Sequence, residues 1–140
     1  MAIRKIRIDL GVEIKMGPLP VLLPRDKLRD SPPKIEKEYR YAAIGRIDYP
    51  ESPEDPGYLI YLKPGVYGDE TADVLDYAVK HKDFPHDTTA DQWFDESQFE
   101  SYRRLGQFVV TAVFGEPSGP ARDYPPTRLR DIIEKRGGEL

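Results

Sequence analysis

The chain has 140 residues, of which 39% are hydrophobic and 33% are charged, and this length and composition suit one soluble globular domain. The formal net charge of −4 argues against a nucleic-acid binder, because such proteins usually carry a basic excess that neutralises phosphates. Cysteine is absent, which excludes disulfides and cysteine metal ligands. No run approaches the roughly 20 apolar residues of a membrane-spanning helix, so we expect a cytoplasmic protein whose contact with membranes is at most peripheral.

The first segment carries two overlapping apolar periodicities. Ile3, Ile6 and Leu10 recur at helical spacing, and Gly11 follows where such a helix would end. Over Val12–Met16, apolar and polar residues alternate as they do in a half-buried strand. We therefore expect a helix to about Leu10 and then a short strand.

Prolines and tyrosines organise the next part of the chain. Five prolines fall within residues 17–34, and we expect a loop there because proline lacks the amide donor of a sheet. Arg40–Tyr49 and Tyr58–Lys63 are rich in tyrosine and isoleucine, and they flank a segment of prolines and glycine typical of turns. This pattern predicts an antiparallel hairpin over about 40–63.

Helical patterns follow in the second half. Asp69 can cap a helix running to about Lys82, with Val74, Tyr77 and Ala78 along one face. The helix is therefore expected over about 69–82.

The longest helix is expected after two capping-box patterns. Thr89 is followed three residues later by Gln92, and Asp95 is followed in the same way by Gln98. From Asp95 the chain repeats apolar residues at helical spacing up to Gly115, which predicts a helix over about 95–114. The apolar residues of this helix are Tyr102, Leu105, Val109, Ala112 and Val113.

These elements predict an α+β fold, in which a small and mainly antiparallel sheet packs against the helices over about 69–82 and 95–114. We expect residues 1–114 to form a single module. Residues 115–140 are expected to be a Pro-rich linker with a short helix over Thr127–Arg136, which Gly137 and Gly138 would end.

The serines and histidines provide no recognisable catalytic or metal motif. The chain contains neither G-x-S-x-G nor Asp-Gly, and Ser97 and Ser101 lie inside a predicted helix. His81 and His86 are five residues apart with Pro85 between them, which does not place two imidazoles on one helical face. Helix capping and surface hydrogen bonding are the favoured roles, although an acid–base role for His86 stays open. We predict no catalytic, cofactor or metal residues.

The segment from Lys63 to Thr71 has glycines but differs from a phosphate-binding loop. It lacks the Gly-Lys-Ser/Thr ending, and its lysine precedes Gly65 and Gly68 instead of following them. Turning the chain from strand to helix is the favoured role of these glycines.

An aromatic group at Trp93, Phe94, Phe99 and Tyr102 is the candidate interaction surface. Large aromatic side chains are mostly buried, so core packing is the favoured interpretation and an exposed partner-binding patch the alternative.

Two stretches of the chain together resemble one family. Ala2–Gly11 is similar to the segment that follows the catalytic aspartate in large bacterial patatin-like phospholipases. The run YLIYLKPGVYGDETADVLDYAVKHKDFPHDTTADQWFDESQFESYRRLG, Tyr58–Gly106, resembles the C-terminal end of the same proteins, and Tyr41–Tyr49 fits the strand between them. The resemblance covers about residues 2–110.

The resemblance implies an α/β/α lipid acyl hydrolase that uses a serine–aspartate dyad without histidine. The motifs that hold this dyad, and a glycine-rich oxyanion loop, are missing from this chain, so no catalytic residue carries over. We therefore expect a noncatalytic C-terminal module or fragment, inactive alone, that supports a lipase site in a larger assembly. Its partner would be a catalytic patatin-like domain or a second copy of the chain. The alternatives are an independent interaction protein and a hydrolase with an unfamiliar site, using Ser101 or His86.

Overall fold

A computed structural model of the protein describes residues 2–20, 40–88, 90, 93–117 and 126–137. Within these residues the chain forms helices and one small antiparallel sheet, which confirms the predicted α+β fold class. The contacts group the chain into two compact units. The first comprises Met1–Pro20, Ala42–Leu62 and Pro117–Leu140, and the second comprises Val21–Tyr41 and Lys63–Glu116.

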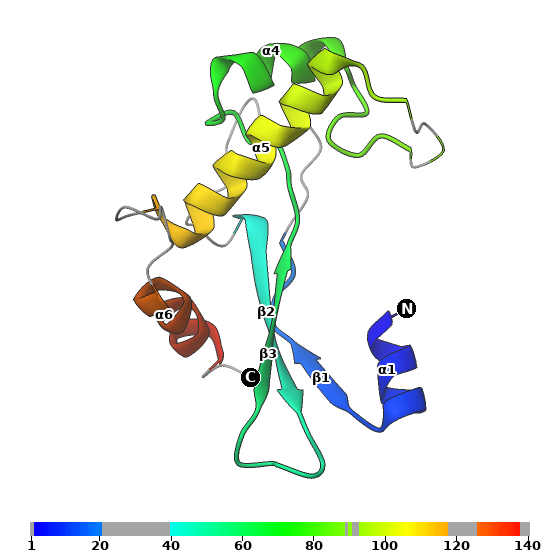
Figure 1. The fold of residues 1–140 in the computed structure, drawn as a ribbon, viewed down its shortest axis with the longest axis vertical. Coiled ribbons are helices and arrows are strands. Elements are labelled where there is room, and N and C mark those ends of the chain that lie inside the picture. The colour runs from blue at the N-terminus through cyan, green and yellow to red at the C-terminus, as the bar shows by residue number, and fades with distance from the viewer. Residues whose placement is uncertain (1, 21–39, 89, 91–92, 118–125, 138–140) are drawn as a thin grey trace. The chain divides into compact units, whose positions relative to one another are not determined.

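The first unit is built on a three-stranded sheet with the order β1-β2-β3 (Figure 1). Its strands are β1 (Glu13–Met16), β2 (Ala42–Asp48) and β3 (Gly57–Leu62). Both neighbouring pairs are antiparallel, and β2 and β3 form the predicted hairpin. The predicted strand near the N-terminus is the third member of this sheet.

The central strand β2 provides the buried part of the sheet. Ala42, Ala43 and Ile44 are at most 1% exposed. All three pair with β3, whereas β1 pairs with the second half of β2, from Gly45 to Asp48. At Gly45 the strands β1 and β2 lie so close together that an added Cβ would collide with the sulfur of Met16, the residue of β1 that pairs with Gly45. A side chain at this position would require the Met16 side chain to move.

Two helices accompany the sheet in this unit. Helix α1 (Ala2–Leu10) contacts β1 and ends where the amide of Gly11 donates to the Arg7 carbonyl, with Gly11 at φ +67°. Glycine adopts this left-handed conformation without steric cost, and the helix ends where the sequence predicted. Helix α6 (Pro126–Gly137) contacts β2, and its Ile132 is only 6% exposed.

The second unit contains helices α4 (Ala72–Lys80) and α5 (Glu96–Phe114). They pack together, with α4 beside the N-terminal half of α5 (Figure 1). On α4 the predicted residues Val74, Tyr77 and Ala78 are buried. On α5 the predicted Leu105, Val109 and Val113 are buried together with Ser101, whereas Tyr102 and Ala112 are only partly buried. Burial of these apolar stripes is the main driving force for pairing the helices.

The start of α4 differs from the sequence-based prediction. The helix begins at Ala72 with Thr71 at the N-cap position, so Asp69 does not cap it. The carboxylate of Asp69 instead accepts from Arg40 at 3.4 Å. It also lies 3.5 Å from the Tyr41 hydroxyl, whose proton goes to the nearer Glu70 at 2.9 Å. The carboxylate that was predicted to cap the helix therefore binds a partner that lies far away in the sequence.

The ends of α5 agree with the prediction. The Asp95 carboxylate accepts from the amide of Gln98 at 2.6 Å, and Gly115 closes the helix at φ +83°. The side-chain nitrogen of Gln98 donates to the Asp87 carboxylate at 3.5 Å. The other proposed capping pair, Thr89 and Gln92, lies outside the described residues, as do most of the Pro-rich segments.

Candidate functional site

Four aromatic residues around the start of α5 form the candidate site, which we call the aromatic surface: Trp93, Phe94, Phe99 and Tyr102. The first two directly precede the N-cap residue, and the other two lie three residues apart on the helix. Trp93 is 91% exposed, Phe99 63% and Phe94 50%. The favoured prediction of core packing is therefore wrong for these three side chains.

A groove accompanies this surface. Phe94, Phe99, Tyr102 and Arg103 line a space of about 540 Å³, which lies in the size range of ligand pockets. The rings of Phe94 and Tyr102 meet edge-on with centroids 5.6 Å apart, a favourable aromatic geometry. The groove therefore presents an apolar surface whose rings are partly held by one another.

Tyr102 connects the aromatic surface to the core of the second unit. Its hydroxyl donates to the Asp87 carboxylate at 2.6 Å, and its ring meets the buried Phe84 with centroids 4.8 Å apart. Burial of the phenol, followed by the hydrogen bond to Asp87, raises the pKa of Tyr102 to about 12. The ring is thus fixed in place and neutral at physiological pH.

The periodicity of α5 contains a signal that separates core from surface. Ser101, Leu105, Val109 and Val113 recur every four residues and are buried, whereas Phe99 falls outside this stripe. A stricter use of helical phase would have placed Phe99 at the surface from the sequence. No comparable signal exists for Trp93 and Phe94, which precede the helix.

The glycine-containing segment before α4 binds an anion from its own chain. The buried Glu70 carboxylate accepts from the amides of Tyr67 and Gly68, both at 2.8 Å. It also accepts from the Tyr41 hydroxyl at 2.9 Å. The backbone donors that a phosphate loop would offer to a ligand are therefore occupied by this carboxylate.

The buried Tyr41 phenol is held in its neutral form by this arrangement. Burial, followed by the negative charges of Glu70 and Asp69, raises the pKa of Tyr41 far above the usual value near 10. The side chain is fully buried and meets Tyr67 and Phe108 edge-on. This cluster stabilises the fold and offers no group to a substrate.

The two histidines occupy different local environments. The His81 ring stacks on Tyr77 with centroids 3.9 Å apart, at the residue that ends α4. Burial, together with the nearby charge of Lys63, lowers the pKa of His86. Across the described part of the chain, no group of three or more histidine, aspartate and glutamate side chains is arranged to hold a metal ion.

The serines considered as nucleophiles lie on α5, as predicted. Ser101 is buried, and its hydroxyl donates to the Ser97 carbonyl at 2.7 Å, one turn earlier in the helix. A nucleophilic serine instead donates its proton to a general base, which a backbone carbonyl cannot replace. The geometry gives no support to a hydrolase site at Ser101.

No family model, curated protein or solved structure matches the chain. None of the helices in the described residues is long and apolar enough to cross a membrane.

Proposed function

We propose that the chain is a noncatalytic binding module that docks through the aromatic surface onto the catalytic domain of a patatin-like lipid acyl hydrolase. The observation that carries the binding role is the exposure of Trp93 and Phe99 beside an apolar groove. The identity of the partner rests on the sequence resemblance alone.

The exposed aromatic side chains are typical of a protein–protein interface. Contiguous exposed apolar patches are uncommon on soluble proteins, and aromatic residues are enriched at the centres of protein–protein interfaces. Rigid rings bury a large area with little loss of conformational entropy, so they act as anchors for a partner. Trp93 and Phe99 have the exposure and the chemistry of such anchors.

The borders of the aromatic surface are polar, as the rim of an interface should be. Arg103 lines the groove and pairs with Glu100 at 2.6 Å, while Arg104 pairs with the same carboxylate at 2.8 Å. Exposed ion pairs of this kind contribute little affinity but restrict the orientation of a partner. An apolar centre with charged neighbours therefore supports a specific protein partner.

The test is binding to a patatin-like catalytic domain that is expressed without its own C-terminal segment. Titration calorimetry with the intact chain should show a saturable complex. Phe99→Ala and Trp93→Ala should each weaken it by about tenfold or more, as expected for interface anchors. Val79→Ala is the matched control, because Val79 is an apolar residue of the same unit that is 79% exposed and lies on α4.

Two results would contradict the proposal. Equal losses in all three variants, or no complex at all, would remove the docking role of the aromatic surface. Hydrolysis of a short-chain acyl ester by the chain alone, abolished by Ser101→Ala in a protein that stays folded, would instead establish a catalytic site in the chain. We expect no turnover by the chain alone.

A further inference from the structure

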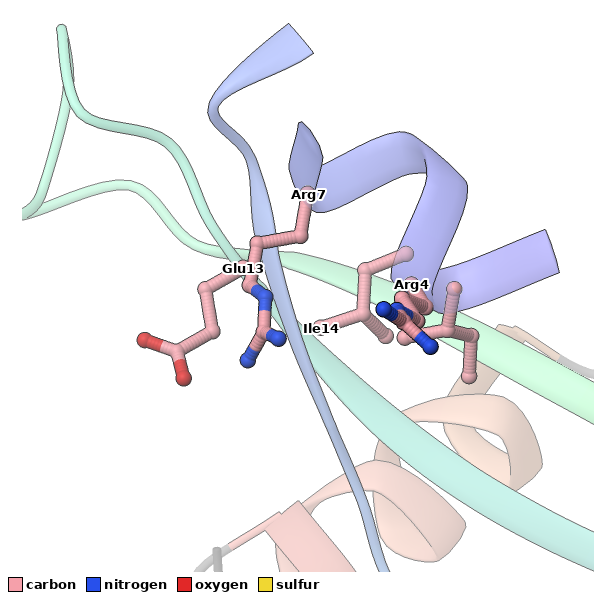
Figure 2. Close-up of a pocket in the computed structure, with 5 residues that line it drawn as sticks. Arg4, Arg7, Glu13 and Ile14 are labelled. Atoms are coloured by element: carbon pink, nitrogen blue, oxygen red, sulfur yellow. The ribbon is translucent and has the colours of Figure 1, made fainter. Parts of the chain in front are cut away.

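A small pocket in the first unit lies between α1 and β1 (Figure 2). It has a volume of about 210 Å³ and is lined by Ile3, Arg4, Arg7, Glu13 and Ile14. Figure 2 shows the side chains of Arg4 and Arg7 extending from the helix on either side of Ile14. The Glu13 carboxylate lies on the far side of the Arg7 side chain. The pocket thus combines an apolar floor with three charged groups.

The two guanidinium groups lack counter-ions within the described part of the chain. Lys5 and Asp9, the other charged residues of α1, form an ion pair with each other. Arg4 and Arg7 have no carboxylate within 4 Å among the described residues. They lie three positions apart on one helical face, where like charges repel, so an anion between them would relieve this repulsion.

The third charged group makes the pocket suited to a ligand with both signs of charge. Among the described residues, the Glu13 carboxylate makes no ion pair, although its charge acts on Lys15, whose ammonium group pairs with Asp48 at 2.9 Å. A phosphate matches the donors of two guanidinium groups, and an ammonium group matches a carboxylate. The volume is below the roughly 300–1,000 Å³ of pockets for drug-sized ligands, which indicates a small ligand.

We infer that this pocket binds a small zwitterionic phosphate, with the phosphate between Arg4 and Arg7 and the ammonium group at Glu13. Phosphoethanolamine has this chemistry, either as a free metabolite or as the headgroup of a lipid. The pocket is independent of the proposed docking function, because it lies in a different unit of the chain and uses none of the aromatic surface.

The test is calorimetric titration of the intact chain with phosphoethanolamine and, separately, with inorganic phosphate. We expect saturable binding that is tighter for phosphoethanolamine. Arg4→Gln and Arg7→Gln should each weaken both ligands by about tenfold, since each removes a charge-assisted hydrogen-bond donor. Lys5→Gln removes the same charge from the same helix outside the pocket and should leave affinity within about twofold of the original.

Glu13→Gln tests the ammonium contact separately. It should reduce the affinity for phosphoethanolamine to that for inorganic phosphate while leaving the latter unchanged. Equal affinities of the unmodified chain for the two ligands would overturn the zwitterionic assignment. Absence of saturable binding, or an equal loss in Lys5→Gln and Arg4→Gln, would overturn the site itself.

Vesicles distinguish the two sources of the ligand. Flotation with vesicles containing phosphatidylethanolamine, compared with vesicles of phosphatidylglycerol alone, reports on the headgroup at a membrane surface. Binding of free phosphoethanolamine without preferential flotation supports the pocket with a metabolite as its ligand, whereas binding of both supports a headgroup ligand. Flotation without binding of the free ligand would contradict the inference, because the pocket itself should accept the detached headgroup.

Discussion

At the scale of single residues, the second unit depends on buried polar groups that are fully paired. Glu70 is 6% exposed and collects two backbone amides and one phenol as hydrogen-bond donors. A buried carboxylate is costly unless such donors satisfy it, and removing one of them leaves part of the charge uncompensated. The Tyr41 phenol is the side-chain donor of this set that a substitution can remove cleanly.

Tyr41→Phe should lower the free energy of unfolding by about 1.5–3 kcal/mol, the usual contribution of a hydrogen bond to a charged group. Urea unfolding followed by circular dichroism measures this loss. Tyr61→Phe removes a hydroxyl from a tyrosine of β3 that is 40% exposed, and should change stability by less than about 0.5 kcal/mol. An equal effect of both substitutions would show that the hydrogen bond to Glu70 contributes no stability.

The raised pKa of Tyr102 makes stability depend on pH in the alkaline range. Its pKa rises from the usual 10.0 to about 12 in the folded protein, so the folded state holds this proton more tightly than the unfolded state. The resulting contribution to stability is complete below pH 10 and is lost as pH rises through about 12. Tyr102→Phe should therefore lose less stability over this interval than the unmodified chain. Urea unfolding at successive pH values measures the two slopes, and parallel slopes would contradict the assignment.

At the scale of secondary structure, α5 is the best-defined element of the second unit. Its N-terminus has a side-chain acceptor at Asp95, its C-terminus has the left-handed Gly115, and its buried stripe packs against α4. A cap satisfies an amide that the helix leaves unpaired, and a negative charge there also interacts favourably with the helix dipole. The position of Trp93 and Phe94 depends on this cap because they directly precede it.

Asp95→Ala should destabilise the protein by about 1 kcal/mol, the typical cost of losing an N-cap acceptor. Asp95→Asn retains an acceptor oxygen and should recover most of this loss, which makes it the matched control. Thermal unfolding of the three proteins at one pH gives the comparison. If the alanine and asparagine variants unfold at the same temperature, the hydrogen bond to the Gln98 amide is not a stabilising contact.

At the scale of the whole molecule, charge and exposed aromatic area act together. The chain carries a formal net charge of −4 at pH 7 and has a sequence pI near 5.3. Electrostatic repulsion between copies therefore disappears as pH falls toward 5.3, while the exposed rings of Trp93 and Phe99 remain. Electrostatic repulsion then opposes apolar contact between copies least.

Self-association should accordingly be greatest near pH 5.3 and decrease on either side. Light scattering of the purified chain across this range measures it. The double variant Trp93→Ser, Phe99→Ser should associate less at pH 5.3 than the unmodified chain, whereas Val79→Ser should not differ from it. If none of the three substitutions changes self-association, the copies associate through another surface.

The sequence by itself determined the local structure. Gly11 and Gly115 mark helix ends because glycine adopts a positive φ freely, and apolar periodicity identified the buried stripes of α4 and α5 and the β2–β3 hairpin. Only the tertiary structure decided the roles that depend on distant partners. Asp69 pairs with Arg40 instead of capping a helix, and Trp93 stays exposed instead of joining the core. Side-chain type and spacing do not encode which partners arrive from elsewhere in the chain, and burial and hydrogen bonding depend on those partners.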